Sequence, residues 1–201
     1  MTSILHKRDL KSDPFEQFSL WFEDAGRADI ALPNAMAVAS ASRDGVPSVR
    51  MVLLKSFDDR GFVFYTHYDS EKGRQLQENP RAEFHFYWAP LDRQVRIRGT
   101  VEKTSREESE TYFHSRPKES QWSAWASPQS EVVESRHKLE EMRAEIMKTY
   151  PEGTIPLPPF WGGFRLTPER FEFWSDGVHR YHDRFCYVRE GASWTLSRMA
   201  P

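Results

Sequence analysis

The sequence predicts one α+β domain built on a mostly antiparallel β-barrel. Two observations indicate this fold class. About six to eight segments alternate apolar and polar residues, which is the period of strands with one buried face, and several of them are joined by short turns. A few helical segments are inserted among these strands, as in antiparallel barrels with peripheral helices. The sequence contains no internal repeat and no sign of a second domain.

The composition limits the classes of protein to which this chain can belong. Its 201 residues are 38% hydrophobic and 29% charged, enough for one good core but not comfortably for two. With a net charge of −2 and no long apolar run, nucleic acid and membranes are not expected partners. The single cysteine, Cys186, cannot form an internal disulfide, and residues 1–7 lack the apolar region of a signal peptide. We therefore expect a cytoplasmic protein in which Cys186 is a small buried residue.

The first regular element follows a polar N-terminal segment. Residues 1–12 lack periodicity, so we expect a flexible arm that precedes a single domain over residues 13–201. Asp13 and Pro14 are typical of an N-cap and a first helical residue. The aromatic residues that follow share one helical face and are expected in the core. They are Phe15, Phe18, Trp21 and Phe22.

A hairpin comes next. Residues 35–40 predict a strand, residues 43–45 a turn, and residues 48–57 the return strand. The return strand carries Arg50 and Lys55. Residues five positions apart face opposite sides of a regular strand, unless a bulge or a twist brings them together.

A third strand, residues 62–67, leads into a short helix over residues 70–79. Ser70 is suited to cap this helix, and Lys72 lies in its first turn. A lysine is poorly placed there because the helix dipole favours anions at that end. A bound phosphate would reconcile the two, since backbone N–H groups and Lys72 would share one anion.

Residues 81–88 and 93–101 predict a second hairpin. Arg96 and Arg98 share one face of its return strand. A solvated sheet edge explains these two arginines as well as a functional role does.

Three helices are expected after this hairpin. The capping box at residues 105–108 opens the first, Pro117 ends it and starts the second over residues 118–126, and the third covers residues 130–150. Residues 151–159 form a proline-rich crossing back to the sheet.

Three polar side chains recur at intervals of four along the first two helices. They are Tyr112, Arg116 and Ser120. Residues four apart are neighbours on a helix face, so two hydroxyls and a guanidinium would converge on one small anion even if Pro117 kinks the axis.

The C-terminal region combines strands with a cluster of histidine and arginine. Residues 161–166 and 170–174 alternate as strands, residues 175–177 turn, and residues 179–185 continue from a loop into the next strand. Three interpretations stay open for the cluster from the residues alone. Its charges could solvate a sheet face, or it could bind an anion or a cofactor through planar guanidinium and imidazole groups. The third, metal binding, would use His179, His182 and Asp183 as ligands, although a spacing of three suits a helix better than a strand.

Taken together and in chain order, these segments resemble the pyridoxine (pyridoxamine) 5′-phosphate oxidases over about residues 13–201. The motifs that carry the resemblance are Arg50–Lys55, Phe64–Thr66, Arg93–Val95, Tyr112–Pro117, Pro128–Ser130, Pro156–Gly163 and His179–Arg184.

The resemblance implies an FMN-binding split barrel that works as a homodimer, with each flavin held between two subunits. By the matched motifs, FMN contacts would fall to Arg50, Met51, Val52, Leu53, Leu54, Lys55, Tyr65, Thr66, Lys72, Gln94, Gln129, Ser130, Trp174 and Arg184. Substrate contacts would fall to Lys55, Tyr112, Arg116, Ser120, Arg180 and His182. One position departs from the pattern: Glu71 stands where related members commonly have an arginine beside the phosphate-contacting lysine.

The activity implied is oxidation of pyridoxine and pyridoxamine 5′-phosphates to pyridoxal 5′-phosphate, the vitamin B6 cofactor. A hydride would leave C4′ of the substrate for flavin N5, and O2 would reoxidise the flavin to give hydrogen peroxide. Arg180 and His182 would be the catalytic residues, acting by orienting the substrate ring, while the general base stays unassigned. The alternative is a flavin- or pyridoxal-phosphate-binding module on the same barrel without turnover.

Overall fold

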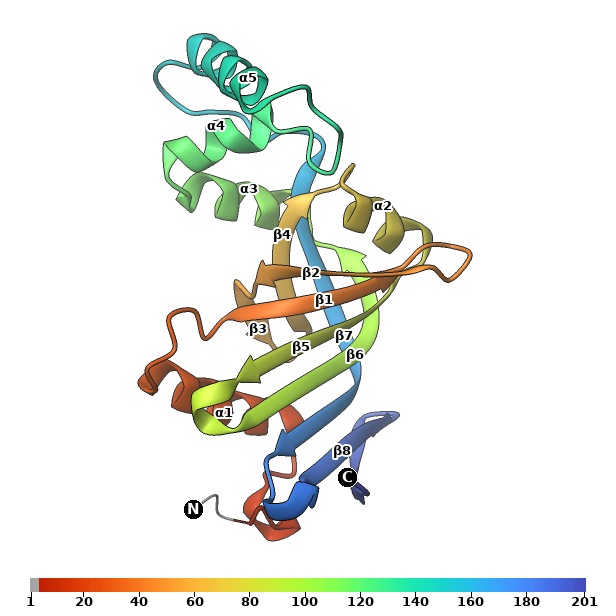
Figure 1. Cartoon of the computed structure of the whole chain (residues 1–201). Coiled ribbons are helices and arrows are strands. Elements are labelled where there is room, and N and C mark those ends of the chain that lie inside the picture. Colours follow the sequence, from red (N-terminus) through yellow and green to blue (C-terminus); the bar gives the residue numbers. More distant parts are fainter. Residues whose placement is uncertain (1–3) are drawn as a thin grey trace.

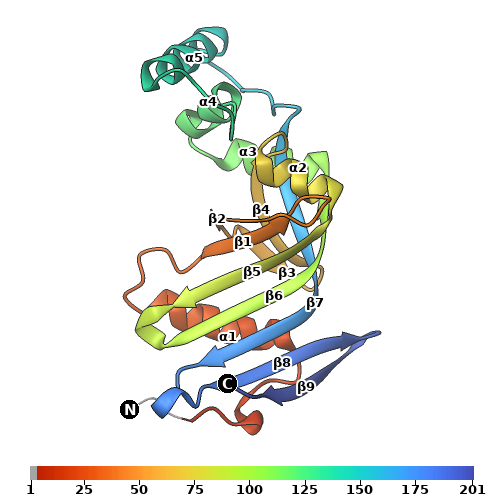
Figure 2. The same cartoon turned by 45° about the vertical axis from the view of Figure 1, so that its right-hand side comes forward.

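A computed structural model describes residues 4–201, and an antiparallel sheet forms its centre (Figure 1). Within these residues the sheet has nine strands, in the order β2-β1-β5-β6-β7-β4-β3, and β8 and β9 continue it from β7. The strands are β1 (Ala35–Ala41), β2 (Pro47–Leu53), β3 (Ser56–Asp58), β4 (Gly61–His67), β5 (Arg81–Trp88), β6 (Arg93–Lys103), β7 (Trp161–Ser175), β8 (Asp183–Glu190) and β9 (Ser193–Met199). The sheet curls into a half-barrel, which confirms the predicted, mostly antiparallel α+β fold (Figure 2).

The long strand β7 links the two ends of the sheet. Its first half pairs with β4 and its second half with β8, while β6 runs along its other edge. The prediction of two strands, 161–166 and 170–174, was wrong because a register shift between β6 and β7 lets one strand continue through Pro168. At this irregularity a Cβ on Gly99 would lie 1.9 Å from the carbonyl oxygen of Thr167, so only glycine fits.

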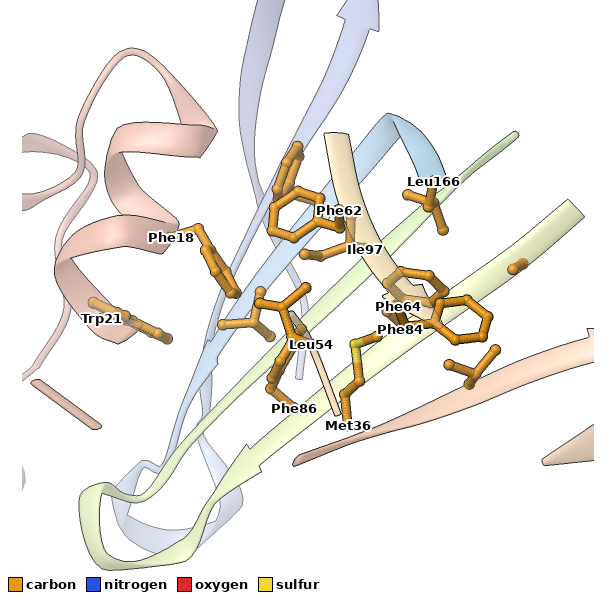
Figure 3. Close-up of a cluster of buried hydrophobic side chains, with 14 of the residues drawn as sticks. Phe18, Trp21, Met36, Leu54, Phe62, Phe64, Phe84, Phe86, Ile97 and Leu166 are labelled. Atoms are coloured by element: carbon orange, nitrogen blue, oxygen red, sulfur yellow. The ribbon is translucent and has the colours of Figure 1, made fainter. Parts of the chain in front are cut away.

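The core lies between the sheet and helix α1 (Pro14–Arg27). Asp13 caps this helix, because its carboxylate accepts a hydrogen bond of 2.7 Å from Phe15 N. The ring of Phe18 is fully buried, with its centroid 4.9 Å from that of Phe62 and 5.2 Å from that of Phe86 (Figure 3). Each such ring contributes about 1.5–3 kcal/mol by leaving water. The aromatic face predicted for this helix therefore packs in the core, where edge-to-face contacts orient the rings.

The other long helices gather at the opposite end of β7 (Figures 1 and 2). They are α3 (Arg106–Ser115), α4 (Lys118–Ala126) and α5 (Arg136–Thr149), and the shorter α2 (Glu71–Glu78) lies nearby. A second apolar cluster, which includes Phe113, Trp122 and Trp161, joins these helices to the start of β7. The indole N–H of Trp122 donates to the Tyr150 carbonyl oxygen at 3.0 Å, which ties α4 to the end of α5.

Two element boundaries differ from those predicted. The return strand 48–57 divides into β2 and β3, because Leu54 turns into the core and interrupts the strand before Lys55. The third helix begins at Arg136 rather than at residue 130, since the side chain of Ser135 is its N-cap and accepts from Lys138 N at 3.1 Å.

The N-terminal segment runs along β8 and β9. Residues 1–3 of the predicted flexible arm lie outside the described residues. Beyond them, Leu5 N donates to the Asp183 carboxylate at 2.8 Å, and the Arg198 guanidinium donates to the Leu5 carbonyl oxygen at 2.9 Å. A single 3-10 turn, η1 (Lys7–Asp9), follows. Flexibility of this arm stays a prediction, as does the single-domain boundary. Among the described helices, none is both long and apolar enough to cross a membrane.

Candidate active site

A cavity of about 610 Å³ opens where β2, β4, α2, α3 and α4 meet, a size suited to a small-molecule ligand. Many of the residues predicted for cofactor and substrate binding line it. They are Met51, Val52, Leu53, Lys55, Tyr65, Thr66, Lys72, Tyr112, Arg116, Ser120 and Gln129. A second cavity of about 530 Å³ shares Met51, Lys72 and Gln129 with the first and adds Arg50 and Ser130. The two cavities are therefore adjacent, and together they are called the hollow below.

Arg116 lies at one end of this hollow. It follows the last residue of α3 in extended conformation, and Pro117 then starts α4, so the two helices meet at a corner instead of continuing one helix. Tyr112 and Ser120 nevertheless line the same cavity from either side of the corner. The guanidinium carbon of Arg116 lies 4.7 Å from the ring centroid of Trp161, a cation–π distance.

One atom of Arg116 lacks a protein partner. Its Nη1 is buried, and no hydrogen-bond acceptor for it is found among residues 4–201. Burial lowers the pKa of this guanidinium, yet an arginine keeps its charge at neutral pH. An unpaired buried donor costs about 1–3 kcal/mol, and more when charged, so an anionic ligand at this place would remove a real penalty.

A stack of aromatic rings forms the wall beside Arg116. The ring centroids of Tyr65 and Tyr112 lie 3.9 Å apart with an interplanar angle of 17°, and Trp161 continues the stack at 5.6 Å from Tyr65. Burial raises the pKa of Tyr65 to about 12, so its hydroxyl stays a hydrogen-bond donor at neutral pH. Lys55 Nζ lies 5.9 Å from the centroid of the Tyr112 ring. Flat apolar surface and positive charge are thus adjacent.

The other end of the hollow contains a second cationic group. Lys72 is buried, and its Nζ donates to Gln129 Oε1 at 2.9 Å and to Thr66 Oγ1 at 3.2 Å. Burial first, and the nearby charge of Arg50 second, lower the pKa of Lys72 to about 8, so it is protonated at pH 7. Arg50 donates to Ser40 Oγ at 2.6 Å. Two cations beside the N-terminus of α2 are chemically suited to a phosphate.

The remaining predicted residues lie elsewhere in the same chain. Leu54 is 4% exposed and belongs to the core (Figure 3). The others are Gln94, Trp174, Arg180, His182 and Arg184, which are found around the far end of β7. Tyr65 pairs with Gly163 and Gln94 pairs with Trp174, and these two pairs are separated by about 36 Å of strand. One protomer therefore does not bring the two groups of residues together.

These five residues at the far end of β7, called the far group below, make contacts with one another and with their neighbours. The rings of Trp174 and His182 are 4.7 Å apart, and His182 Nδ1 lies 3.0 Å from an Asp176 carboxylate oxygen. Arg180 is exposed. Its backbone and that of His179 before it both lie in the left-handed region, with φ of 66° at Arg180 and 59° at His179. Two successive non-glycine residues in that region are strained, as loop residues at binding sites often are. Within residues 4–201, no three potential metal ligands of the His, Cys, Asp or Glu type cluster.

Sequence reasoning missed the residues that hold these arginines. Ser40 and Gln75 position Arg50, and Glu172, 3% exposed, accepts from Arg184 Nε at 2.9 Å. A buried carboxylate that neutralises arginine could not be recognised as such from the alternation of the strand alone.

Two family models cover most of the chain. Residues 22–150 match the model described as pyridoxamine 5′-phosphate oxidase, and residues 161–201 match the pyridoxine 5′-phosphate oxidase C-terminal dimerisation region. A pyridoxine/pyridoxamine 5′-phosphate oxidase of Rubrobacter xylanophilus is 53% identical over 94% of this chain and 87% of its own length. One of Vibrio vulnificus is 48% identical over 98% of this chain and 93% of its own.

Solved structures agree with this likeness. PhzG from Burkholderia lata, in complex with tetrahydrophenazine-1-carboxylic acid, superimposes with a TM-score of 0.92 at 32% identity, covering 100% of this chain and 99% of that one. A pyridoxamine 5′-phosphate oxidase-related, FMN-binding protein of Nostoc punctiforme has a TM-score of 0.75 at 16% identity, covering 94% and 98% of the two chains. The second likeness concerns the fold alone.

Proposed function

The chain belongs to the pyridoxamine 5′-phosphate oxidase family, and from this premise we propose that it oxidises pyridoxine and pyridoxamine 5′-phosphates to pyridoxal 5′-phosphate, using FMN, with O2 as acceptor and hydrogen peroxide as product. The observation that carries the proposal is the buried, unpartnered Nη1 of Arg116, since a phosphate oxygen would supply the acceptor that the described protein does not. Tyr112, Ser120 and Lys55 line the same cavity and would complete the contacts to that phosphate.

The second cationic group would hold the cofactor. Lys72, Arg50 and the N-terminus of α2 would bind the FMN phosphate, and Thr66, Gln129 and Ser130 would add hydrogen bonds. Bound there, FMN would supply the redox chemistry, as acceptor of a hydride from the substrate and donor of electrons to O2. The donor set supports this fit, because two separate cationic groups in two adjacent cavities match two phosphorylated molecules.

The protein works, in this proposal, as a homodimer. Because the far group is separated from the hollow by most of β7, a second copy of the chain would bring Gln94, Trp174, Arg180, His182 and Arg184 to it. Two further observations support this assembly. The C-terminal part matches a dimerisation region, and large apolar side chains such as Met51 and Tyr181 are 65% and 81% exposed in the single chain.

The residues of the far group would orient the substrate. Arg180 would cover the face of the substrate ring opposite the flavin, and His182 would hydrogen-bond a polar ring substituent or the phosphate. Neither needs to remove a proton, since water can accept the hydroxyl proton of the alcohol as the hydride departs, so the general base stays unassigned. With pyridoxamine phosphate the oxidation would give an imine, which water would hydrolyse to the aldehyde and ammonia.

The likeness to PhzG favours a second candidate, oxidation of a fused-ring carboxylic acid. The Arg116 guanidinium can donate hydrogen bonds to a carboxylate as well as to a phosphate. The two candidates differ in charge and in the number of acceptor oxygens. A phosphate can use Lys55, Tyr112, Arg116 and Ser120 at once, which favours the phosphorylated substrate.

The test begins with the visible spectrum of the purified protein. Pyridoxine phosphate, pyridoxamine phosphate and a tricyclic dihydro-aromatic acid are then added separately, first without oxygen and then in air. Bleaching of bound flavin by the phosphorylated compounds, followed by one peroxide per aldehyde in air, is the expected result. Flavin that stays oxidised with every compound would indicate a binding module, and a colourless protein that cannot be reconstituted with FMN would refute both.

A further inference from the structure

The cationic group around Arg50 and Lys72 also contains a carboxylate. Glu71 is the first residue of α2, and it lines the same cavity as both cations. Its Oε1 accepts a hydrogen bond of 2.9 Å from Ser48 Oγ and one of 3.3 Å from Gln75 Nε2. The two hydrogen bonds thus hold the carboxylate at the cavity wall, although the side chain is exposed to solvent.

The negative charge of Glu71 reaches both cations. Burial lowers the pKa of Arg50 and of Lys72, and the charge of Glu71 opposes the shift at each. Gln75 connects the groups directly, because its Oε1 lies 3.4 Å from Arg50 Nη2 while its Nε2 donates to Glu71. An anion that occupies the cavity therefore experiences Glu71 together with the two cations.

We propose that Glu71 sets how tightly this chain holds FMN, because its carboxylate repels the cofactor phosphate that Arg50 and Lys72 attract. The inference rests on the function proposed above, and it concerns only the phosphate end of the cofactor. Riboflavin has the same ring system without the phosphate, so its binding should be independent of Glu71. The consequence is a cofactor site with a lower affinity for FMN than its two cations alone would give.

Glutamine separates charge from hydrogen bonding at this position. Glu71→Gln has the same shape and keeps an acceptor for Ser48, but it removes the negative charge. Glu71 is exposed, so its interaction with the phosphate is partly screened by water. We expect Glu71→Gln to tighten FMN binding about two- to fivefold at low salt, in the range of exposed charge pairs. Glu71→Arg, which reverses the charge, should tighten it further.

A structural role of Glu71 would give a different result, namely FMN binding that is unchanged or weaker in Glu71→Gln. Glu71 accepts from the side chains of Ser48 and Gln75. Arg50 in turn donates to the Ser48 carbonyl oxygen and to Gln75 Oε1, each at 3.4 Å. If holding Arg50 were the dominant role of the carboxylate, Glu71→Gln would leave FMN binding unchanged or weaken it.

The experiment is a titration of apoprotein with FMN and with riboflavin, followed by quenching of flavin fluorescence. It is done at pH 6.5, where Lys72 is protonated, at low salt and again at about 0.5 M salt, which shortens the Debye length to a few ångströms. The matched control is Glu78→Gln, which removes the same charge from the exposed far end of α2, about 10 Å along the helix axis.

The inference predicts that Glu71→Gln binds FMN more tightly and riboflavin unchanged. It also predicts that the gain shrinks at high salt and that Glu78→Gln has little effect. Unchanged or weaker FMN binding at low salt overturns it, and so does an equal gain for riboflavin. Wild-type protein that binds FMN no more tightly than riboflavin overturns the proposed phosphate site itself. That outcome is distinguishable, because it is read from the wild-type titrations alone.

Discussion

At the scale of single residues, Arg116 links stability to binding. Its buried Nη1 has no acceptor within residues 4–201, so the ligand-free protein carries a cost that ligand binding would relieve. Arg116→Met should therefore raise KM for pyridoxine phosphate about tenfold or more, equivalent to one charge-assisted hydrogen bond, without lowering Tm. Steady-state kinetics and thermal unfolding check the two halves. Lys118→Met, an exposed cation at the start of α4, is the control. A large loss of Tm in Arg116→Met would make Arg116 a structural residue.

Arg180 and His182 should separate chemistry from binding. Hydride transfer depends on distance and alignment, so we expect Arg180→Met to retain FMN and lose at least about tenfold in kcat/KM, or roughly 1.4 kcal/mol. His182→Asn should act mainly through KM. Anaerobic stopped-flow reduction of the bound flavin measures both. Wild-type rates and affinities in the two variants would mean that this cluster only solvates the sheet.

Lys72 should make FMN binding depend on pH. Its pKa of about 8 is below the usual value because burial and Arg50 disfavour the charged form. The phosphate becomes a dianion above about pH 6, and Lys72 loses its proton as pH rises through about 8 in the free protein, so affinity should be highest between these values. Riboflavin titrated in parallel should show no such maximum. An FMN affinity that stays flat from pH 7 to about 9.5 would contradict the assigned role of Lys72.

At the scale of elements, most strands and caps could be predicted because their signals are local. Ser70 and Asp13 cap the helices where expected, and the apolar alternation marks the strands. The exceptions depend on distant partners. Continuity of β7 through Pro168 requires the register shift against Gly99, which no local pattern shows.

The register shift between β6 and β7 yields a stability prediction. A Cβ at position 99 would overlap backbone atoms of Thr167 on the neighbouring strand. Gly99→Ala should therefore destabilise the protein by about 1–3 kcal/mol or more, as overpacking does. Gly26→Ala in α1, where nothing lies within 4 Å of the added Cβ, should be neutral or stabilising by helix propensity. Thermal unfolding of the two variants compares them, and equal Tm values would contradict the steric argument.

At the scale of the whole molecule, the sequence indicated which residues belong to the binding site but not that they lie in two places far apart in one chain. Intervals of four predicted that Tyr112, Arg116 and Ser120 would lie close together, and all three line one cavity. Arg180 and His182 could not be placed relative to them from the sequence, because the separation depends on the length and continuity of β7. Only the paired strands reveal that the two groups of residues lie far apart in one chain.

The central claim, that two copies of the chain build each site, is tested most directly by mixing two impaired variants. Arg116→Met damages one group and Arg180→Met the other. In a dimer that contains one copy of each, one site would carry both changes and the other neither. After subunit exchange of equal amounts, activity at low substrate should therefore rise to roughly a quarter of the wild-type value, as twofold symmetry requires. The claim of a shared site would be contradicted if activity stayed at the average of the two variants after verified exchange. A monomer that keeps FMN and full activity would contradict it as well.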